Sequence, residues 1–245
     1  CSATDGVWQD TCNAPSFTWS GASDEHSGLA GYYVYWGPDA DGVSTTFTTT
    51  AGYAPGVVSD GTYYLRVDTE DNLGHRAGWM TLFEFKYDDS SPTNPDRPAN
   101  PGATCSATDG VWQAECGDPD FTWTGASDPH SGIAGYYVYW GMDPDGTSTT
   151  FTTTAAHNPG PVTSGSTYYL RVDTEDALGH RSGWKTLFEF KFDDSAPGSP
   201  DRPADPGAAC SASDGVWQNA CNDPGFTWIA PNDGASGIAG YYVYW

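Results

Sequence analysis

Apolar and polar residues alternate along this chain in short runs, which Gly, Pro, Asp and Ser separate. In "YYVYW" and in "TYYLRVDTED" every second position has the same character, and Val, Thr, Tyr, Phe and Trp are plentiful. A period of two residues is typical of β-strands, and no segment sustains the helical period of 3.6. The pattern therefore predicts an all-β protein. The strands expected in the first part of the chain are Gly6–Gln9, Ser16–Trp19, Ala30–Trp36, Ser44–Thr50, Thr62–Thr69 and Trp79–Tyr87.

The alternation also assigns two faces to each strand, because successive side chains of a strand point to opposite sides. We expect Tyr33, Tyr35, Tyr64 and Arg66 to face outward, which makes them a candidate exposed binding face, with cross-strand pairing as the alternative role. The residues expected to face the core are Leu29, Tyr32, Val34, Trp36, Tyr63, Leu65, Val67, Thr69, Trp79, Phe83, Phe85 and Tyr87.

The chain repeats itself three times. Copies begin at Cys1, Cys105 and Cys210, and the third copy ends after 36 residues. A period near 105 residues suits a small globular domain, since solenoid repeats have periods of about 20–50 residues. Proline-rich runs near Ser91 and Ala196 act as stiff spacers. The resulting division is 1–90, 91–195 and a partial third repeat at 196–245, which extends to its third expected strand, strand C.

Six cysteines form three pairs with ten residues between partners. Even numbers at a constant spacing predict local disulfides and an oxidising, extracellular location. The turn dipeptide Asp5-Gly6 in "CSATDGVWQDTC" would fold the first pair together. No CxxC or HxxxH spacing is present to indicate zinc. The predicted pairs are Cys1–Cys12, Cys105–Cys116 and Cys210–Cys221.

The segments "FTWSGASDEHSGLAGYYVYWG" and "GTYYLRVDTEDNLGH" resemble the fibronectin type III and related immunoglobulin-like repeats of bacterial extracellular surface proteins. The resemblance rests on Trp19, on Tyr32-x-Val34-x-Trp36, and on the pattern that runs from Tyr63 to Gly74. It implies tandem antiparallel β-sandwich domains. The disulfide-closed hairpin at the front of each copy is an addition that a plain fibronectin type III domain lacks.

The charge is strongly acidic, with 9 Lys and Arg against 32 Asp and Glu and a net charge of −23. This balance argues against nucleic-acid partners, because phosphate binding requires clustered cations. No apolar stretch is long enough for direct membrane insertion. The acidic residues either form a solvated surface, bind calcium or reflect a saline habitat.

In a type III topology, two loops of each domain meet at the end that faces the preceding linker. Carboxylates would then converge at the junctions, and clustered carboxylates are calcium ligands. The alternative is that each acid caps a local turn. No cofactor is required by the pattern, and calcium is the one it could take. The candidate ligands are Asp88, Asp89, Asp128 and Asp176 at the first junction, and Asp193, Asp194 and Asp233 at the second.

Histidines recur in pairs, His26 with His75 and His130 with His180. Such pairs could indicate a transition-metal site, but the third copy has Ala235 at the matching position. A hydrogen-bonded loop histidine is therefore the favoured interpretation.

The sequence lacks the features that would indicate catalysis, namely a Ser/His/Asp order, a phosphate loop or paired carboxylates in a cleft. The chain is therefore predicted not to be an enzyme. Repetition, spacers and disulfides favour an extracellular structural or interaction protein that forms a surface fibre, stalk or filament with copies of itself or other cell-surface components. The alternatives are an adhesion or carbohydrate-binding module, and accessory domains of a larger secreted enzyme. The partial third repeat would be completed either by a longer chain or by strands from a neighbour.

Overall fold

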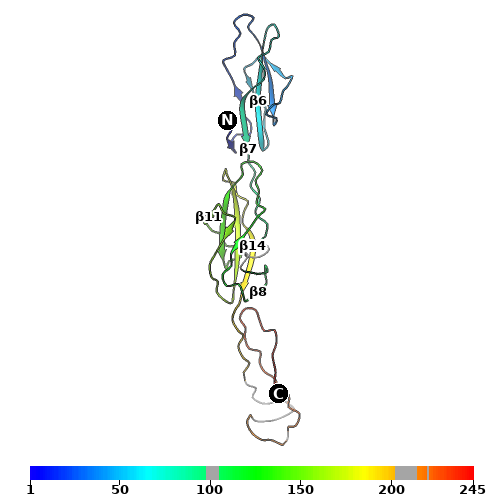
Figure 1. The fold of residues 1–245 in the computed structure, drawn as a ribbon, viewed down its shortest axis with the longest axis vertical. Helices are drawn as coiled ribbons and strands as arrows, with labels where there is room; N and C mark the ends of the chain where they lie inside the picture. The colour runs from blue at the N-terminus through cyan, green and yellow to red at the C-terminus, as the bar shows by residue number, and fades with distance from the viewer. Residues whose placement is uncertain (98–104, 202–213, 220) are drawn as a thin grey trace.

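The computed structural model describes residues 1–97, 105–201, 214–219 and 221–245. Two β-sheet repeats and the third segment lie end to end along one long axis (Figure 1). No helix in the described part of the chain is long and apolar enough to cross a membrane.

The first repeat has two sheets. The larger sheet has the order β1-β7-β6-β3-β4, in which β3, β6 and β7 are antiparallel, and the smaller one pairs β2 with β5. The strands are β1 (Trp8–Gln9), β2 (Phe17–Thr18), β3 (Leu29–Gly37), β4 (Phe47–Thr48), β5 (Gly52–Tyr53), β6 (Gly61–Asp71) and β7 (Met80–Tyr87).

The second repeat has the same topology, with the sheets β11-β10-β13-β14-β8 and β12-β9. The predicted β-sandwich is therefore confirmed for both full repeats. Its strands are β8 (Trp112–Gln113), β9 (Phe121–Thr122), β10 (Ile133–Gly141), β11 (Phe151–Thr152), β12 (Ala156–His157), β13 (Ser166–Asp176) and β14 (Lys185–Phe192).

The core between the two sheets is aromatic, as the alternation predicted. The Phe17 ring on β2 lies 5.3 Å from the Trp36 ring and 5.1 Å from the Phe83 ring. Trp36 in turn stacks on Tyr63 at 5.3 Å, with the two rings nearly parallel. Such contacts bury large apolar areas and add favourable ring geometry. Phe121 and Trp140 repeat the arrangement in the second copy.

One predicted strand is shorter than the sequence indicates. Within the run Ser44–Thr50 only β4 (Phe47–Thr48) is a strand, and it belongs to the larger sheet, whereas β5 (Gly52–Tyr53) follows the run and belongs to the smaller sheet. The chain crosses between the sheets at residues 49–51, and Ala51 and Tyr53 pack against the core on arrival. The stretch lacks a turn dipeptide, so the alternation did not reveal the crossing.

A β-bulge changes the expected face of Trp79. Leu65 pairs with Phe83 but Arg66 pairs with Thr81, so Leu82 has no opposite residue. The extra residue inverts the alternation beyond it. Trp79 consequently lies 5.8 Å from the Arg76 guanidinium on the outer face, and the prediction that it faces the core is wrong.

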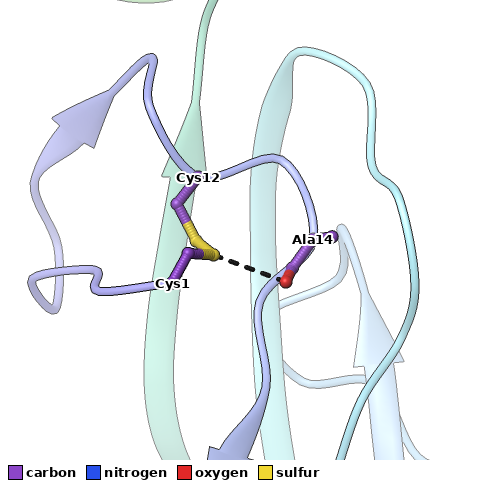
Figure 2. Close-up of a disulfide and its surroundings, with 3 residues drawn as sticks. All are labelled: Cys1, Cys12 and Ala14. Atoms are coloured by element: carbon purple, nitrogen blue, oxygen red, sulfur yellow. Dashed lines mark hydrogen bonds between the residues drawn. A yellow bond between two sulfur atoms is a disulfide. The ribbon is translucent and has the colours of Figure 1, made fainter.

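Two of the predicted disulfides are present. Cys1 pairs with Cys12 and Cys105 with Cys116, with Cα atoms 5.6 and 5.2 Å apart. Figure 2 shows the first, in which Cys1 Sγ lies 3.4 Å from the Ala14 carbonyl oxygen. Cys221 is also disulfide-bonded, and Cys210 lies outside the described residues.

The first disulfide closes a segment that protects the edge of the larger sheet. The chain turns at Asp5-Gly6, where Gly6 has a φ of 72° that favours glycine. The Gly6 N–H donates to the Glu84 carbonyl oxygen (2.9 Å), and β1 then runs parallel to β7. An edge strand that is covered in this way offers fewer open backbone groups to other chains.

Candidate functional site at the repeat junctions

The first linker docks on the second repeat. The Thr93 N–H donates to the Ser127 carbonyl oxygen (2.9 Å), and the Asp96 N–H donates to the Thr124 carbonyl oxygen (2.9 Å). The Asn94 side-chain oxygen accepts from the Thr174 N–H at 3.1 Å. Backbone pairing of this kind removes the freedom of a flexible tether.

Asp88 connects the end of β7 to the next repeat and is fully buried. Its Oδ2 atom accepts a hydrogen bond from the Ser131 N–H (3.0 Å), across the junction. Its Oδ1 atom accepts from the Ser90 N–H (3.2 Å) and hydroxyl (2.9 Å). Burial alone would raise the pKa of Asp88, but the hydrogen bonds from Ser131 and Ser90 together lower it below its usual value.

The second junction repeats this contact. The Asp193 Oδ2 atom accepts from the Ser236 N–H at 3.0 Å. Hydrogen bonds from Ser195 and then Ser236 lower the pKa of Asp193 well below its usual range. We call the Asp88–Ser131 and Asp193–Ser236 contacts the junction clamps.

The equivalent loop of the first repeat is bonded differently. There the Ser27 N–H donates to Asp24 of its own loop at 2.6 Å. In the second repeat Asp128 still accepts from the N–H groups of its own loop, including that of His130 (2.9 Å), but the Ser131 N–H turns to Asp88. The clamp therefore redirects a donor that otherwise closes a local turn.

Three of the predicted calcium ligands meet at the first junction. One carboxylate oxygen each from Asp88, Asp128 and Asp176 lies within 4.8 Å of the others. Asp176 is only 1% exposed, and the Asp128 Oδ2 atom is buried without a hydrogen-bond partner. Asp89 is exposed and instead accepts from the Tyr87 hydroxyl (2.9 Å).

The candidates at the second junction are placed in the same way where the structure describes them. The Asp233 Oδ1 atom accepts from the Ala235 N–H at 3.2 Å, as Asp128 does in its own loop. The Asp194 N–H donates to the Ser164 hydroxyl oxygen at 3.0 Å. Residues 221–245 thus contain the counterpart of Asp128 but not that of Asp176.

The disulfide-closed segment also reaches the junction, which the sequence did not indicate. The Trp8 ring lies 5.9 Å from the His130 ring, edge to face. The Asp10 Oδ2 atom lies 3.5 Å from His180 Nε2. Both contacts join positions more than 100 residues apart, so no local signal could have identified them.

His180 is a hydrogen-bonded loop histidine, as favoured from the sequence. Its Nδ1 atom lies 2.7 Å from Asp176, and His75 lies 2.9 Å from Asp71 in the first repeat. These side-chain hydrogen bonds raise the pKa of both histidines.

The candidate exposed face is largely covered by the chain's own contacts. The Arg76 guanidinium lies over the Tyr33 ring, 4.0 Å from its centre. The Tyr35 hydroxyl accepts from the Asp39 N–H at 3.1 Å, within the loop that follows β3.

The other two members of that face are also engaged. Tyr64 donates to Glu84 (3.3 Å), and Arg66 donates to the Gly42 carbonyl oxygen (2.8 Å). A sugar-stacking platform needs open ring faces, so these cross-strand contacts favour the alternative role of these residues.

Comparisons with known proteins find similarity in sequence and in structure. No protein-family model matches the chain. Exoglucanase B of Cellulomonas fimi is 30% identical over 179 residues, which cover 70% of this chain and 15% of the relative. The chain thus spans a small part of the curated relative's length.

Two solved structures are also similar. The fibronectin(III)-like modules of Clostridium thermocellum CbhA align over 78% of this chain and 91% of theirs, at 15% identity and a TM-score of 0.32. The FN1–FN3 domains of chicken CNTN1 align over 82% of this chain and 67% of theirs, at 14% identity and a TM-score of 0.35. The order of the strands in its sheets makes the chain a tandem of β-sandwich repeats. These repeats are similar to fibronectin type III modules.

Proposed function

We propose that this chain is a stiff, extended spacer of tandem β-sandwich repeats within a larger secreted protein. The observation that carries the proposal is the junction clamp, which occurs at both junctions with the same two atoms and the same distance. A repeated contact between consecutive repeats fixes their relative orientation, whereas flexibly tethered domains share few contacts.

Three further observations support this role. Residues 93–96 pair with the second repeat, so the first part of the linker is not a free tether. Disulfides suit a secreted protein. The similarity to part of an exoglucanase favours an accessory segment of a larger extracellular protein. A surface fibre or filament would use the same junctions with other partners and remains the second candidate, because the repeats are nearly identical.

Small-angle X-ray scattering of the full chain tests the stiffness. We expect the wild-type profile to fit one extended arrangement, as in Figure 1. Asp88→Ala should require an ensemble with a smaller mean radius of gyration. Asp41→Ala removes the same charge from an exposed turn of the first repeat and should scatter like the wild type. A wild-type profile that requires a broad ensemble of bent chains would contradict the proposal.

We also propose that Asp88, Asp128 and Asp176 bind Ca²⁺ at the first junction, and that Asp193 and Asp233 contribute ligands at the second. Calcium takes six to eight oxygen ligands and prefers carboxylates. The buried, unpartnered Asp128 Oδ2 atom fits this chemistry, because a bound cation would offset its lost hydration.

Thermal unfolding tests the calcium proposal with a matched pair of variants. Ca²⁺ should raise the Tm of the wild type relative to EGTA, since a ligand of the folded state stabilises it. Asp128→Asn should lose most of this response. Asp24→Asn, at the same loop position of the first repeat, should keep it. An unchanged wild-type Tm would reject the calcium site and leave the spacer proposal intact.

A further inference from the structure

We propose that Asp60, Asp88 and His130 form a binding site for a divalent first-row transition-metal ion at the first junction. One ligand atom from each lies within 4.8 Å of the other two. Asp60 directly precedes β6 and Asp88 directly follows β7, both in the first repeat, whereas His130 lies in the loop that precedes β10. Both repeats therefore supply ligands to one ion.

His130 provides the observation that points to a ligand. Its Nδ1 atom is buried and has no hydrogen-bond partner. The Oδ1 atom of Asp88 lies 3.9 Å from it, too far for a hydrogen bond. The other loop histidines of this kind, His75 and His180, each bond a carboxylate within their own repeat. A metal ion between Nδ1 and the two carboxylates would give this nitrogen a partner.

The carboxylates are already oriented. The Asp60 Oδ1 atom accepts from the Asp89 N–H at 3.0 Å. Asp88 is held by Ser90 and Ser131, and the His130 ring is in T-shaped contact with the Trp8 ring. A site whose ligands are held by neighbouring groups loses little freedom when the ion binds.

The donor set selects the class of ion. Imidazole nitrogen suits Zn²⁺, Ni²⁺ and similar ions better than Ca²⁺, and the cysteines described in the structure are in disulfides and offer no thiolate. Metal–ligand bonds of about 2.1 Å allow two ligands to lie up to about 4.2 Å apart. The 3.9 Å between Asp88 and His130 already satisfies this limit.

The second junction provides a natural comparison. It retains Asp193 in place of Asp88, but Ala235 replaces His130, and the Ser164 hydroxyl accepts from the Asp194 N–H where the Asp60 carboxylate accepts from the Asp89 N–H. The site formed by Asp60, Asp88 and His130 is therefore specific to the first junction, although both junctions have the clamp. It shares only Asp88 with the calcium cluster and depends on neither the spacer nor the calcium proposal.

Titration of the full chain without an affinity tag tests the site, with Zn²⁺ as the probe. Calorimetry should show one dominant Zn²⁺ site, and NMR of the histidine ring nitrogens should show a shift at His130 Nδ1. His130→Ala, which copies Ala235, should weaken binding at least tenfold. Asp60→Ser, which copies Ser164 and keeps an acceptor for the Asp89 N–H, should do the same while leaving the His130 ring in place. His26→Ala, at the matching position of the first repeat, should bind like the wild type.

Several results would overturn the proposal. One is the absence of Zn²⁺ binding to the wild type up to millimolar concentration. Another is equal affinity in His130→Ala, or a ring shift at His180 instead of His130. Unfolding curves without metal establish that each variant folds. Because two variants remove different ligands, one that fails to fold leaves the other to decide.

Discussion

The carboxylate of Asp88 and the backbone nitrogen of Ser131 lie 3.0 Å apart across the boundary between two repeats. Asp88 is fully buried, so this hydrogen bond has little competition from water. A charge-assisted bond in such surroundings is stronger than a neutral one. The contact joins two β-sandwiches whose hydrophobic cores are separate, and in the proposed spacer it holds their mutual orientation.

Removal of the clamp should expose the Ser131 amide. Asp88→Ala leaves this N–H without its acceptor, and we expect a cost of about 1–3 kcal/mol to local stability. Hydrogen exchange at Ser131 should therefore accelerate roughly 5- to 150-fold. The Ser27 amide bonds its own loop and serves as an internal control. Equal exchange at Ser131 in both proteins would show that the clamp contributes nothing.

The pKa values of two histidines away from the junction should be shifted in opposite directions. The hydrogen bond to Asp71 raises the pKa of His75 above 6.5, whereas burial lowers that of His157 below it. The contribution of His75 to stability is thus full below pH 6.5 and is lost as the pH rises through its folded pKa. That of His157 is present above pH 6.5 and is lost as the pH falls through its folded pKa.

NMR titration of the ring protons measures both values in one sample. Asp71→Asn should return the pKa of His75 toward 6.5 and leave His157 unchanged. If the two histidines titrate together, the described environments are incorrect.

Arg76 should stabilise the first repeat from its outer face. Its guanidinium pairs with the buried Asp68 at 2.7 Å and stacks on Tyr33. Arg76→Ala would leave a buried carboxylate with fewer partners. Because Arg76 is itself partly exposed, we expect a loss of about 1–3 kcal/mol in the free energy of unfolding, below the value for a fully buried pair.

Urea unfolding of the chain checks this prediction. Lys86→Ala is the control, because Lys86 pairs at 3.3 Å with Glu84, whose carboxylate is partly exposed whereas Asp68 is buried, so this pair should contribute less than about 1 kcal/mol. Arg76→Lys keeps the charge but loses the planar group that stacks on Tyr33. Its loss in the free energy of unfolding should lie between those of the other two variants. Similar effects of all three variants would argue against a special role for Arg76.

The first disulfide should stabilise both its own repeat and the junction. Its loop is short, and loss of the cross-link should cost about 3 kcal/mol in the chain-entropy model. Cys1→Ser with Cys12→Ser should also loosen Trp8 and thereby the edge contact with His130. The measurement is the Tm together with the His130 ring shifts. A lower Tm with unchanged His130 shifts would restrict the role of the disulfide to its own repeat.

The features that could be predicted from the sequence depend on residues that are close together in the chain. Strand alternation needs only the period of two, which is why the inward positions of Tyr32, Val34 and Leu65 followed directly from the letters. The cysteine pairs are close in the chain and have a turn dipeptide near their middle. The repeat period and the aromatic core also followed, because each copy encodes the same sandwich.

Features that depend on contacts between residues distant in the sequence became visible only in the tertiary structure. Asp68 lies on the outward face by alternation, yet it is only 4% exposed because Arg76 and the Gly78 N–H cover it. The bulge at Leu82 depends on how β7 meets β6, and this displaced Trp79.

At the junction the sequence indicated Asp88, Asp128 and Asp176 through an assumed topology, but not Asp10, Asp60 or Trp8. These three lie at turns or in the short disulfide-closed segment, where their residue types are ordinary. Their role arises only when a second repeat is placed against the first, because a carboxylate or ring acquires a function from the atoms within a few ångströms of it and not from its neighbours in sequence.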